Sequence, residues 1–366
     1  AGGDVEFPDQ FRKSAYVQQY SAELQREIPG GVVLSAGYLG SRSDRLGLAG
    51  VNFASPVNIN QVDPRYQSLG SSLLDPVPNP FFGNPIFGDL SQSETVTRAQ
   101  LLRPYPQFGD LYALQPSEGR RHYDAAVFRF EKRFRGGYGG RVNYTWSRTD
   151  DNVIGEGNAY SGRNPSALDN YNLDAEYSRS ITDAPHRLNV SGIVELPFGK
   201  GKRWLDSSGL WNALLGGWSV SAAGYLQSGF PIAVNQRFNN TGLLGGVQRP
   251  NVVPGVDPGH SGSTVENLDS YLNPDAWALA PAFTFGDARR TDTRVRTPMR
   301  HNWDFAFQKS ESVGAGRITA RVEIINAFDR PDFNGPTTAL GNPNFGRILD
   351  VSGFPRLFQF TFRYDW

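Results

Sequence analysis

The sequence predicts an all-β protein of the transmembrane antiparallel β-barrel class. Three observations lead to this prediction: apolar and polar residues alternate along repeated extended segments, glycine-rich turns join these segments in pairs, and long loops separate the pairs. In a soluble protein, an apolar strand face must be covered by another element. In a lipid bilayer it can remain bare.

Composition supports strands and excludes several other classes. The 366 residues include 41 Gly, 25 Pro, 24 Phe, 15 Tyr and 7 Trp, which favours strands joined by turns over long helices. The 36 basic and 36 acidic residues leave no net charge to attract nucleic acid. The absence of cysteine excludes disulfides and thiolate sites. No apolar run reaches the ~18 residues of a membrane-spanning helix.

The first predicted hairpin covers residues 16–41. The even positions from Tyr16 to Ile28 are mainly apolar, and the odd positions are polar apart from Val17. After the turn PGG, the segment VVLSAGYLGS continues the same alternation, with Val32, Leu34, Ala36 and Tyr38 on one face. This pattern is typical of two half-buried strands joined by a tight turn.

Three further hairpins repeat this design. AAVFRFEKRF is joined through RGG to YGGRVNYTWS, RLNVSGIVELPFG is joined through a longer turn to GWSVSAAGYLQSG, and NWDFAFQKS is followed by GRITARVEIINAF. In each hairpin the apolar residues share one face, as Phe128 and Phe130 do in the second and Phe305 and Phe307 in the fourth.

The chain ends on a single strand, RLFQFTFRYDW. From Leu357 onward, its even positions are all aromatic: Phe358, Phe360, Phe362, Tyr364 and Trp366. We expect these rings to face lipid, with the last one in the aromatic girdle at the periplasmic interface. A terminal strand of this kind also resembles the signal read by the barrel-assembly machinery. The alternative is an ordinary amphipathic edge strand.

Long connections separate the hairpins, roughly residues 42–120, 150–184, 230–300 and 329–355, and they are dense in Pro, Gly, Asn and Asp. Such lengths are uncommon in compact soluble domains, whereas outer-membrane barrels combine short periplasmic turns with long extracellular loops. A soluble sandwich or propeller with long insertions is the alternative, but the regular polar faces leave too little apolar surface for a second sheet.

Strand parity gives a further inference. Four hairpins and one strand make nine strands, so the first and last strands run in the same direction and cannot pair antiparallel to close a barrel. Either a strand lies unrecognised, for example in NLDAEYSRS or GRILDVS, or the chain is the C-terminal part of a larger barrel. The N-terminal AGGDVEFPDQFRKS is unlike a secretion signal, so we expect any signal to be removed or to lie upstream.

An ordered set of blocks runs along nearly the whole chain. It comprises YVQQYSAELQREIPGGVVLSAGYLGSRSDRL, VPNPFFG, QLLRPYPQFGDL, YDAAVFRFEKRFRGGYGGRVNYTWSRTDDN, DAPHRLNVSGIVELPFGKGKRW, GGWSVSAAGYLQSGFP and RVEIINAFDRPDFNGP. This succession resembles the C-terminal half of the β-barrel of TonB-dependent outer-membrane receptors of the Oar-like, acidobacterial type.

The resemblance implies a 22-stranded barrel with an N-terminal plug. Residues 1–366 would be the C-terminal part of the β-barrel domain, with the plug and N-terminal domains outside this chain. The implied function is energy-coupled uptake of an unidentified ligand, such as a carbohydrate, a peptide or a metal chelate, across the outer membrane of a Gram-negative bacterium. A structural surface scaffold, or an export or interaction partner without ligand uptake, is the alternative.

The resemblance also implies partners. They are outer-membrane lipid, the missing plug and N-terminal half of the barrel, the TonB energy-coupling system acting through the plug, and the barrel-assembly machinery. An enzymatic activity, a cofactor and a nucleic-acid partner are not expected.

Two groups of residues are candidates for functional roles in such a barrel. Charged residues on the polar strand faces would point into the lumen, where they contact a plug, a ligand or one another: Arg141, Arg187, Glu195, Arg317, Arg321 and Glu323. Aromatic residues in the first long loop could grip a ligand or fasten the loop onto itself: Phe81, Phe82, Tyr105 and Phe108.

Catalytic and metal motifs are weak. GHSGS at residues 259–263 lacks the spacing of a nucleophile elbow, and the four histidines are scattered. The segment DDNVIGEGN offers Asp150, Asp151, Asn152 and Glu156 as calcium ligands but departs from the EF-hand pattern. We therefore expect no catalytic residue, and solvated loop carboxylates rather than a metal site.

Overall fold

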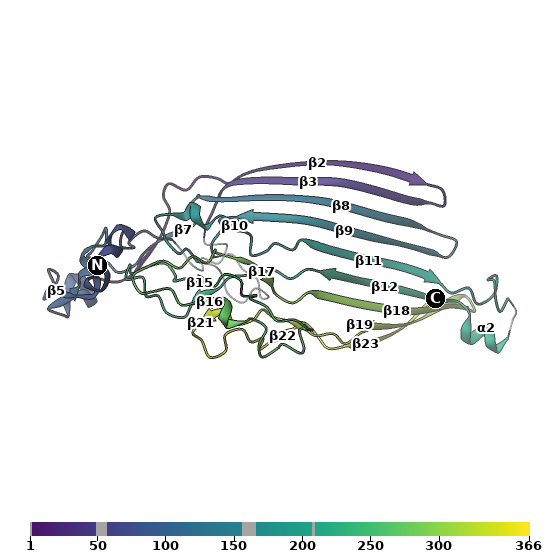
Figure 1. Cartoon of the computed structure of the whole chain (residues 1–366). Helices are drawn as coiled ribbons and strands as arrows, with labels where there is room; N and C mark the ends of the chain where they lie inside the picture. The colour runs from purple at the N-terminus through teal and green to yellow at the C-terminus, as the bar shows by residue number, and fades with distance from the viewer. Residues whose placement is uncertain (1, 49–56, 156–165, 207–208) are drawn as a thin grey trace.

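Nine long strands form one antiparallel sheet in the described part of the chain (Figure 1). The computed structural model describes residues 2–48, 57–155, 166–206 and 209–366. In chain order and in sheet order, the strands are β2 (Tyr16–Ile28), β3 (Val32–Leu46), β8 (Gly119–Arg135), β9 (Tyr138–Asp151), β11 (His186–Glu195), β12 (Trp218–Gln227), β18 (Arg300–Val313), β19 (Gly316–Ile325) and β23 (Leu357–Asp365). The predicted four hairpins and terminal strand are confirmed.

The register keeps the alternation in phase from one edge of the sheet to the other. Leu24 lies opposite Ala36, which lies opposite Phe128, which lies opposite Tyr144. Because directly paired residues share a face, this phase defines one apolar and one polar face. The apolar face carries the even-numbered residues of every long strand except β18, where the odd-numbered Phe305 and Phe307 occupy it.

The two faces differ in what covers them. Phe360 and Phe362 on the apolar face are 75% and 73% exposed. The buried side chains among the described residues of the long strands all lie on the polar face: Val33, Ser43, Ala125, Thr149, Asp151, Gln227 and Ala306. Within the described residues, the chain therefore covers part of the polar face and leaves the apolar face bare.

Tight glycine turns join three of the four hairpins. Gly30, Gly136 and Gly314 have φ values of 93°, 71° and 61°, which glycine adopts without the steric penalty of a Cβ atom. The β11–β12 turn is longer and contains the helix α2 (Leu210–Leu215). Figure 1 shows α2 at one end of the sheet and the long loops at the other.

The four long loops fold into what we term the loop cap, the described residues of 47–118, 152–185, 228–299 and 326–356. Short paired strands run through it, including β14 (Asn235–Gln236) on β21 (Ala339–Leu340), and the N-terminal strand β1 (Val5–Pro8) pairs with β7 (Leu111–Leu114) of the cap. The other short strands are β4 (Val57–Asn58), β5 (Pro76–Pro78), β6 (Thr95–Thr97), β10 (Ser178–Arg179), β13 (Pro231–Ile232), β15 (Asn251–Val252), β16 (Trp277–Ala278), β17 (Asp292–Arg296), β20 (Asp332–Phe333) and β22 (Val351–Ser352).

Helices in the cap are short. They are α1 (Arg98–Leu101) and the 3₁₀ helices η1 (Pro64–Leu74), η2 (Pro85–Ser91), η3 (Leu173–Glu176) and η4 (Pro274–Ala276). In the described part of the chain, we find no helix with the length and apolar character needed to traverse a bilayer.

The hydrophobic cores lie in the loop cap. One cluster joins the third and fourth loops through Ile232, Trp277 and Leu340, and another joins the first and third through Leu73 and Leu243. A further cluster joins the first and second loops through Leu48, Val57, Ile154 and Ala167. The long connections are therefore packed structure rather than bare loops.

Strand boundaries differ from the prediction in several places. β11 ends at Glu195, before the predicted Leu196 and Phe198, and β8 begins at Gly119, before the predicted AAVFRFEKRF. β3 extends to Leu46 with a register shift after Ser43, so the first long loop is shorter than predicted. β19 ends at Ile325 because Asn326 has a φ of 49°, outside the strand region. The segments NLDAEYSRS and GRILDVS contain only the two-residue strands β10 and β22. The number of long strands in the described residues therefore stays odd.

Candidate functional site

The register places the six charged lumen candidates on the polar face. Arg141 is on β9, Arg187 and Glu195 are on β11, and Arg317, Arg321 and Glu323 are on β19. Arg187 and Glu195 lie opposite Gln227 and Ser219, and Arg321 lies opposite Gln308 and Thr361, all of which share that face. The strand periodicity is sufficient to bring these residues to one surface.

Most of these charges are paired with neighbours in the wall. Arg141 donates to Glu131 at 2.8 Å, Glu195 accepts from Lys202 at 2.5 Å, and Arg321 donates to Glu323 at 2.7 Å. Such pairs neutralise the wall locally and contribute little stability where they are exposed to water. Of these three pairs, Arg141–Glu131 joins two neighbouring strands, which is the charge pairing that the sequence left open; Arg321–Glu323 lies within β19, and Lys202 lies in the turn after β11.

Arg187 and Arg317 differ from the other four candidates. Both side chains are exposed, and neither forms an ion pair or a side-chain hydrogen bond within the described residues. They are therefore the two lumen candidates whose guanidinium groups remain available to another molecule.

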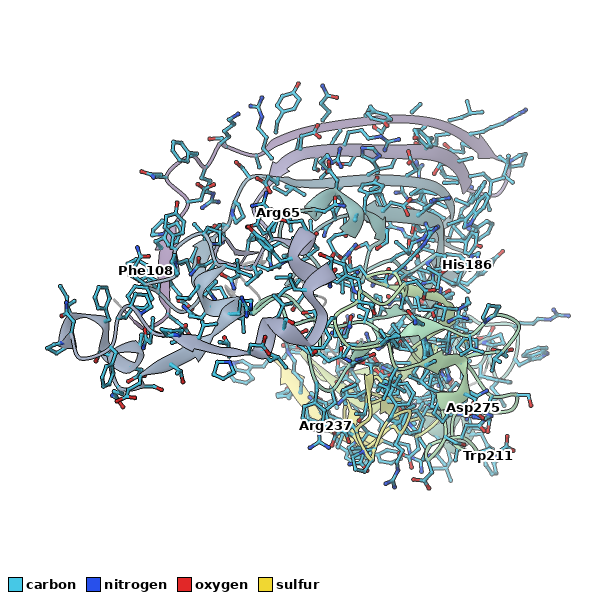
Figure 2. All side chains as sticks on the ribbon, turned by 60° about the vertical axis from the view of Figure 1, so that its left-hand side comes forward. Arg65, Phe108, His186, Trp211, Arg237 and Asp275 are labelled. Carbon is cyan, nitrogen blue, oxygen red and sulfur yellow. The ribbon has the colours of Figure 1, made fainter. Side chains whose placement is uncertain are left out.

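The four aromatic loop candidates do not form one cluster. Phe81 packs on Phe87 of the same loop, with ring centroids 4.9 Å apart, so it fastens the loop onto itself. Phe82 and Tyr105 are 49% and 47% exposed, and Phe108 is half-buried. Figure 2 shows Phe108 in the part of the cap that projects away from the sheet. Of the four candidates, Phe82 and Tyr105 are the exposed ones, each with about half of its surface open to the exterior.

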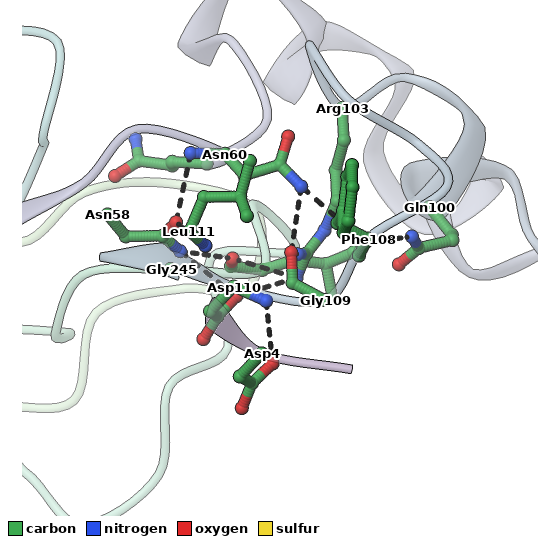
Figure 3. Close-up of polar contacts among 12 residues, drawn as sticks. Asp4, Asn58, Asn60, Gln100, Arg103, Phe108, Gly109, Asp110, Leu111 and Gly245 are labelled. Carbon is green, nitrogen blue, oxygen red and sulfur yellow. Dashed lines mark hydrogen bonds and ion pairs between the residues drawn. The ribbon is translucent and has the colours of Figure 1, made fainter. Parts of the chain in front are cut away.

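A network around Asn60 holds the segment that carries Tyr105 and Phe108 (Figure 3). The Asn60 side-chain amide donates to the carbonyl oxygens of Tyr105 at 3.0 Å and Gly109 at 2.7 Å, and its oxygen accepts from the Tyr105 backbone N–H at 2.8 Å. Gln100 donates to the Phe108 carbonyl at 2.8 Å. Because Asn60 is fully buried, these bonds satisfy groups that water cannot reach.

Arg103 and Asn58 complete this network. Both donate to Asp110 Oδ1, at 2.9 Å and 3.0 Å, and both donate to the carbonyl of Leu244 in the third loop. In Figure 3, Asn58, Arg103 and Asp110 converge on the same backbone turn. These hydrogen bonds therefore fix the backbone that carries Tyr105 and connect it to the first and third loops.

Arg290 is the most deeply buried ion-pairing residue of the cap. Its guanidinium donates to Asp151 Oδ1 at 2.5 Å and to the carbonyl oxygens of Asp151, Val153 and Glu176 at 2.7, 2.7 and 2.9 Å. Burial lowers the pKa of Arg290, and the charge of Asp151 opposes that shift. This residue joins the third loop to the second loop and to the end of β9.

Two more ion pairs join the same loops. Arg249 pairs with the buried carboxylate of Glu176, which also accepts from the Leu168 N–H at 2.8 Å. Arg296 pairs with Asp183 at 2.8 Å, and Asp183 also accepts from the Thr149 N–H at 2.8 Å. The third loop is therefore fastened to the second by three arginines.

The suggested calcium segment is occupied by protein contacts. Asp151 pairs with Arg290 and Arg121, Asp150 pairs with Arg148, and the side chain of Asn152 bonds backbone groups of Arg120 and Glu118. Glu156 lies outside the described residues. Across the described ranges, no group of three His, Asp or Glu side chains is arranged to hold a metal ion.

The terminal strand pairs with β19 along its full length. Phe358, Phe360, Phe362 and Tyr364 lie on the apolar face, and the Trp366 ring lies 6.1 Å from that of Tyr364 and is 95% exposed. The other side of β23 has no partner strand in the described chain.

Sequence reasoning missed the residues that fasten the cap. Asn60, Arg249 and Arg290 lie in long connections with no periodic pattern around them. The only signal was the density of polar residues in those connections, which does not distinguish a buried ion pair from a solvated charge.

A sequence model of an outer membrane β-barrel domain matches residues 1–359. The chain belongs to this family. Membership places the protein in the outer membrane and agrees with a large antiparallel sheet that forms part of a barrel wall. Such barrel families are typically not enzymes.

Two solved structures are similar to this barrel domain. The outer membrane transporter YddB from Escherichia coli is 9% identical, with a TM-score of 0.45, and the match covers 100% of this chain and 34% of that chain. FpvA from P. aeruginosa, bound to a heterologous pyoverdine and iron, is 12% identical, with a TM-score of 0.38 and coverages of 96% and 27%. The chain thus spans about a third or less of these proteins. No curated protein matches it.

Proposed function

We propose that residues 1–366 form the C-terminal part of the wall of a TonB-dependent outer-membrane receptor, which takes up an external ligand by energy coupling through a plug. The observation that carries this proposal is the open sheet. Its edge strands β2 and β23 run in the same direction, so they cannot pair antiparallel with each other. Further strands must complete the wall, as the sequence resemblance to large plugged barrels also implies.

The proposal assigns a location to each face and each end of the sheet. The apolar face contacts lipid, the polar face lines the lumen, the loop cap is extracellular, and the short turns are periplasmic. Arg187 and Arg317 are then the lumen charges available to contact the plug or a passing ligand. Phe82 and Tyr105 are the exposed rings available to contact the ligand first.

Uptake by intact cells tests energy coupling. Cells that express the natural full-length protein are given labelled ferric chelates, oligosaccharides and peptides, with and without a protonophore. We expect one class to bind the surface in both conditions and to enter only in energised cells. Binding without entry in energised cells would favour the scaffold function. Entry that survives the protonophore would contradict energy coupling, because the ligand would then cross without it.

Variants of the loop rings test the binding site. Replacing Phe82 and Tyr105 by alanine should weaken ligand binding by about 1–3 kcal/mol, the usual loss for an aromatic contact at an interface. Phe238→Ala is a matched control because Phe238 is also exposed, at 70%, in a different loop. If the control lost as much binding free energy as the Phe82 and Tyr105 variant, the ligand site would not be specific to the first loop.

A further inference from the structure

The β11–β12 turn differs from the other hairpin turns. It occupies residues 196–217, whereas the turns at Gly30, Gly136 and Gly314 contain two or three residues. It carries α2, in which Leu210, Trp211, Leu214 and Leu215 are exposed at 71%, 67%, 53% and 49%. Figure 2 shows Trp211 at the periphery of the molecule. A short helix with four bare apolar side chains is not suited to water.

Specific contacts hold α2 against the apolar side of the sheet. Trp218 Nε1 donates to the Leu214 carbonyl at 2.9 Å, and Lys309 Nζ donates to the Gly216 carbonyl at 2.8 Å. Trp218 and Lys309 are direct partners on β12 and β18. The helix is therefore fixed beside the strands rather than free at the end of a loop.

A groove of about 580 Å³ lies between the turn and the strands. Its lining is almost wholly apolar and consists of Leu196, Phe198, Leu215, Trp218, Phe307 and Val322. Trp218, Phe307 and Val322 belong to the apolar face of the sheet. The exposed side of α2 therefore continues the surface that an outer-membrane barrel presents to lipid.

The same turn carries basic residues next to aromatic rings. Lys200 and Arg203 are exposed, and the Arg203 guanidinium lies 5.2 Å from the centroid of the Trp204 ring. The nearby Asp206 accepts a hydrogen bond from the Gly201 N–H at 2.7 Å. Tryptophan and basic side chains are favoured where acyl chains meet anionic headgroups.

We propose that the β11–β12 turn is a lipid-binding anchor at the short-turn end of the barrel. Leu210, Trp211, Leu214 and Leu215 insert among phospholipid acyl chains, an acyl chain occupies the groove beneath α2, and Lys200 and Arg203 contact the headgroup phosphates. This role follows from membership of the outer-membrane barrel family and does not depend on ligand uptake.

Fluorescent labelling tests the anchor. The chain has no cysteine, so Leu214→Cys in a full-length protein without other cysteines places one environment-sensitive label on α2. The protein is reconstituted in vesicles of phosphatidylethanolamine and phosphatidylglycerol. We expect blue-shifted emission, strong quenching by brominated lipid and loss of quenching by iodide. Ala315→Cys, in the exposed β18–β19 turn at the same end, should show the opposite pattern.

Other outcomes would overturn the proposal. Iodide quenching at position 214 as strong as at position 315 would mean that α2 lies in water. Protection from both quenchers would mean that protein, such as another part of the receptor, covers the helix. A charge-reversed variant, Lys200→Glu with Arg203→Glu, should lose the dependence of emission on the phosphatidylglycerol fraction. If the emission of this variant still depended on the phosphatidylglycerol fraction, Lys200 and Arg203 would not contact the headgroups, and that part of the proposal would be wrong.

Discussion

The sheet exposes its apolar residues, whereas the loop cap buries them. On the sheet, Leu24 and Phe360 point outward and are 78% and 75% exposed. In the cap, Leu243 and Ile232 point inward and are fully buried. The difference follows from the surroundings of an outer-membrane barrel, because lipid solvates the apolar face whereas loops outside the bilayer must bury apolar groups from water. One region of the chain is thus adapted to lipid and the other to water. The same substitution should therefore change the unfolding free energy by a different amount in each region.

The largest expected effect is the loss of a buried charge partner in the cap. Arg290→Met leaves Asp151 buried without its main cation and should lower the unfolding free energy of the cap by about 3–5 kcal/mol. Limited proteolysis of the loops and denaturant unfolding in vesicles would measure it. Arg294→Met is the control, because its pair with Asp292 is partly exposed and should contribute less than about 1 kcal/mol. Equal effects would contradict a cap fastened from within.

Replacing one leucine in each region compares the buried core of the cap with the exposed apolar face of the sheet. Leu243→Ala should lower the unfolding free energy by about 2–5 kcal/mol, because the transfer free energy is lost and a cavity remains. Leu24→Ala should lose only the transfer part, about 2 kcal/mol, because fluid acyl chains fill the space. Denaturant titration of both variants in vesicles measures the difference. If Leu24→Ala proved the more damaging, protein rather than lipid would cover that side of β2.

Charge substitutions on β23 test which face meets lipid. Phe362→Arg should lower the unfolding free energy by ~2–4 kcal/mol if Phe362 lies near the bilayer midplane. Gln359→Arg should have much less effect, because Gln359 lies on the polar face opposite Glu323. Unfolding in lipid vesicles measures both. Equal damage would mean that the faces are not lipid and lumen.

The smallest expected effect is a pH dependence in the cap. Burial raises the pKa of Tyr271 to about 12, and its hydroxyl donates to the Arg296 carbonyl at 2.6 Å. The unfolded phenol ionises first, near its ordinary value of about 10. Its contribution to stability is therefore complete below pH ~10 and is lost as the pH rises through ~12, by about 2–3 kcal/mol in total.

Comparison of the wild type with Tyr271→Phe isolates this contribution. The difference in unfolding free energy between the two proteins should shrink between pH 10 and pH 12 and stay constant between pH 7 and pH 9. A constant difference over the whole range would place the Tyr271 hydroxyl in contact with water.

Local patterning explains why the sheet could be predicted. Alternation along β2 and β23 is a property of neighbouring residues, and a one-residue slip would move every apolar side chain to the other face. Turn glycines such as Gly30 and Gly136 end the strands for an equally local reason, their positive φ. The candidate lumen residues shared a face for the same reason.

The cap could not be predicted in this way. Arg290 and Asp151 are 139 positions apart, and Gln61 meets Asp169 at 2.8 Å across 108 positions. The segment LWNALL is too short for a helical period to indicate which side faces lipid. Only the fold shows that Phe81 is fastened to its own loop while Phe82 is exposed.

The local sequence predicts the nine long strands, their phase and the aromatic end of the chain, because successive side chains of a strand point to opposite faces. Folding establishes which charges are paired, which loop rings remain exposed, and that α2 continues the apolar face. Those properties depend on contacts between segments distant in sequence, whose partners no local pattern identifies.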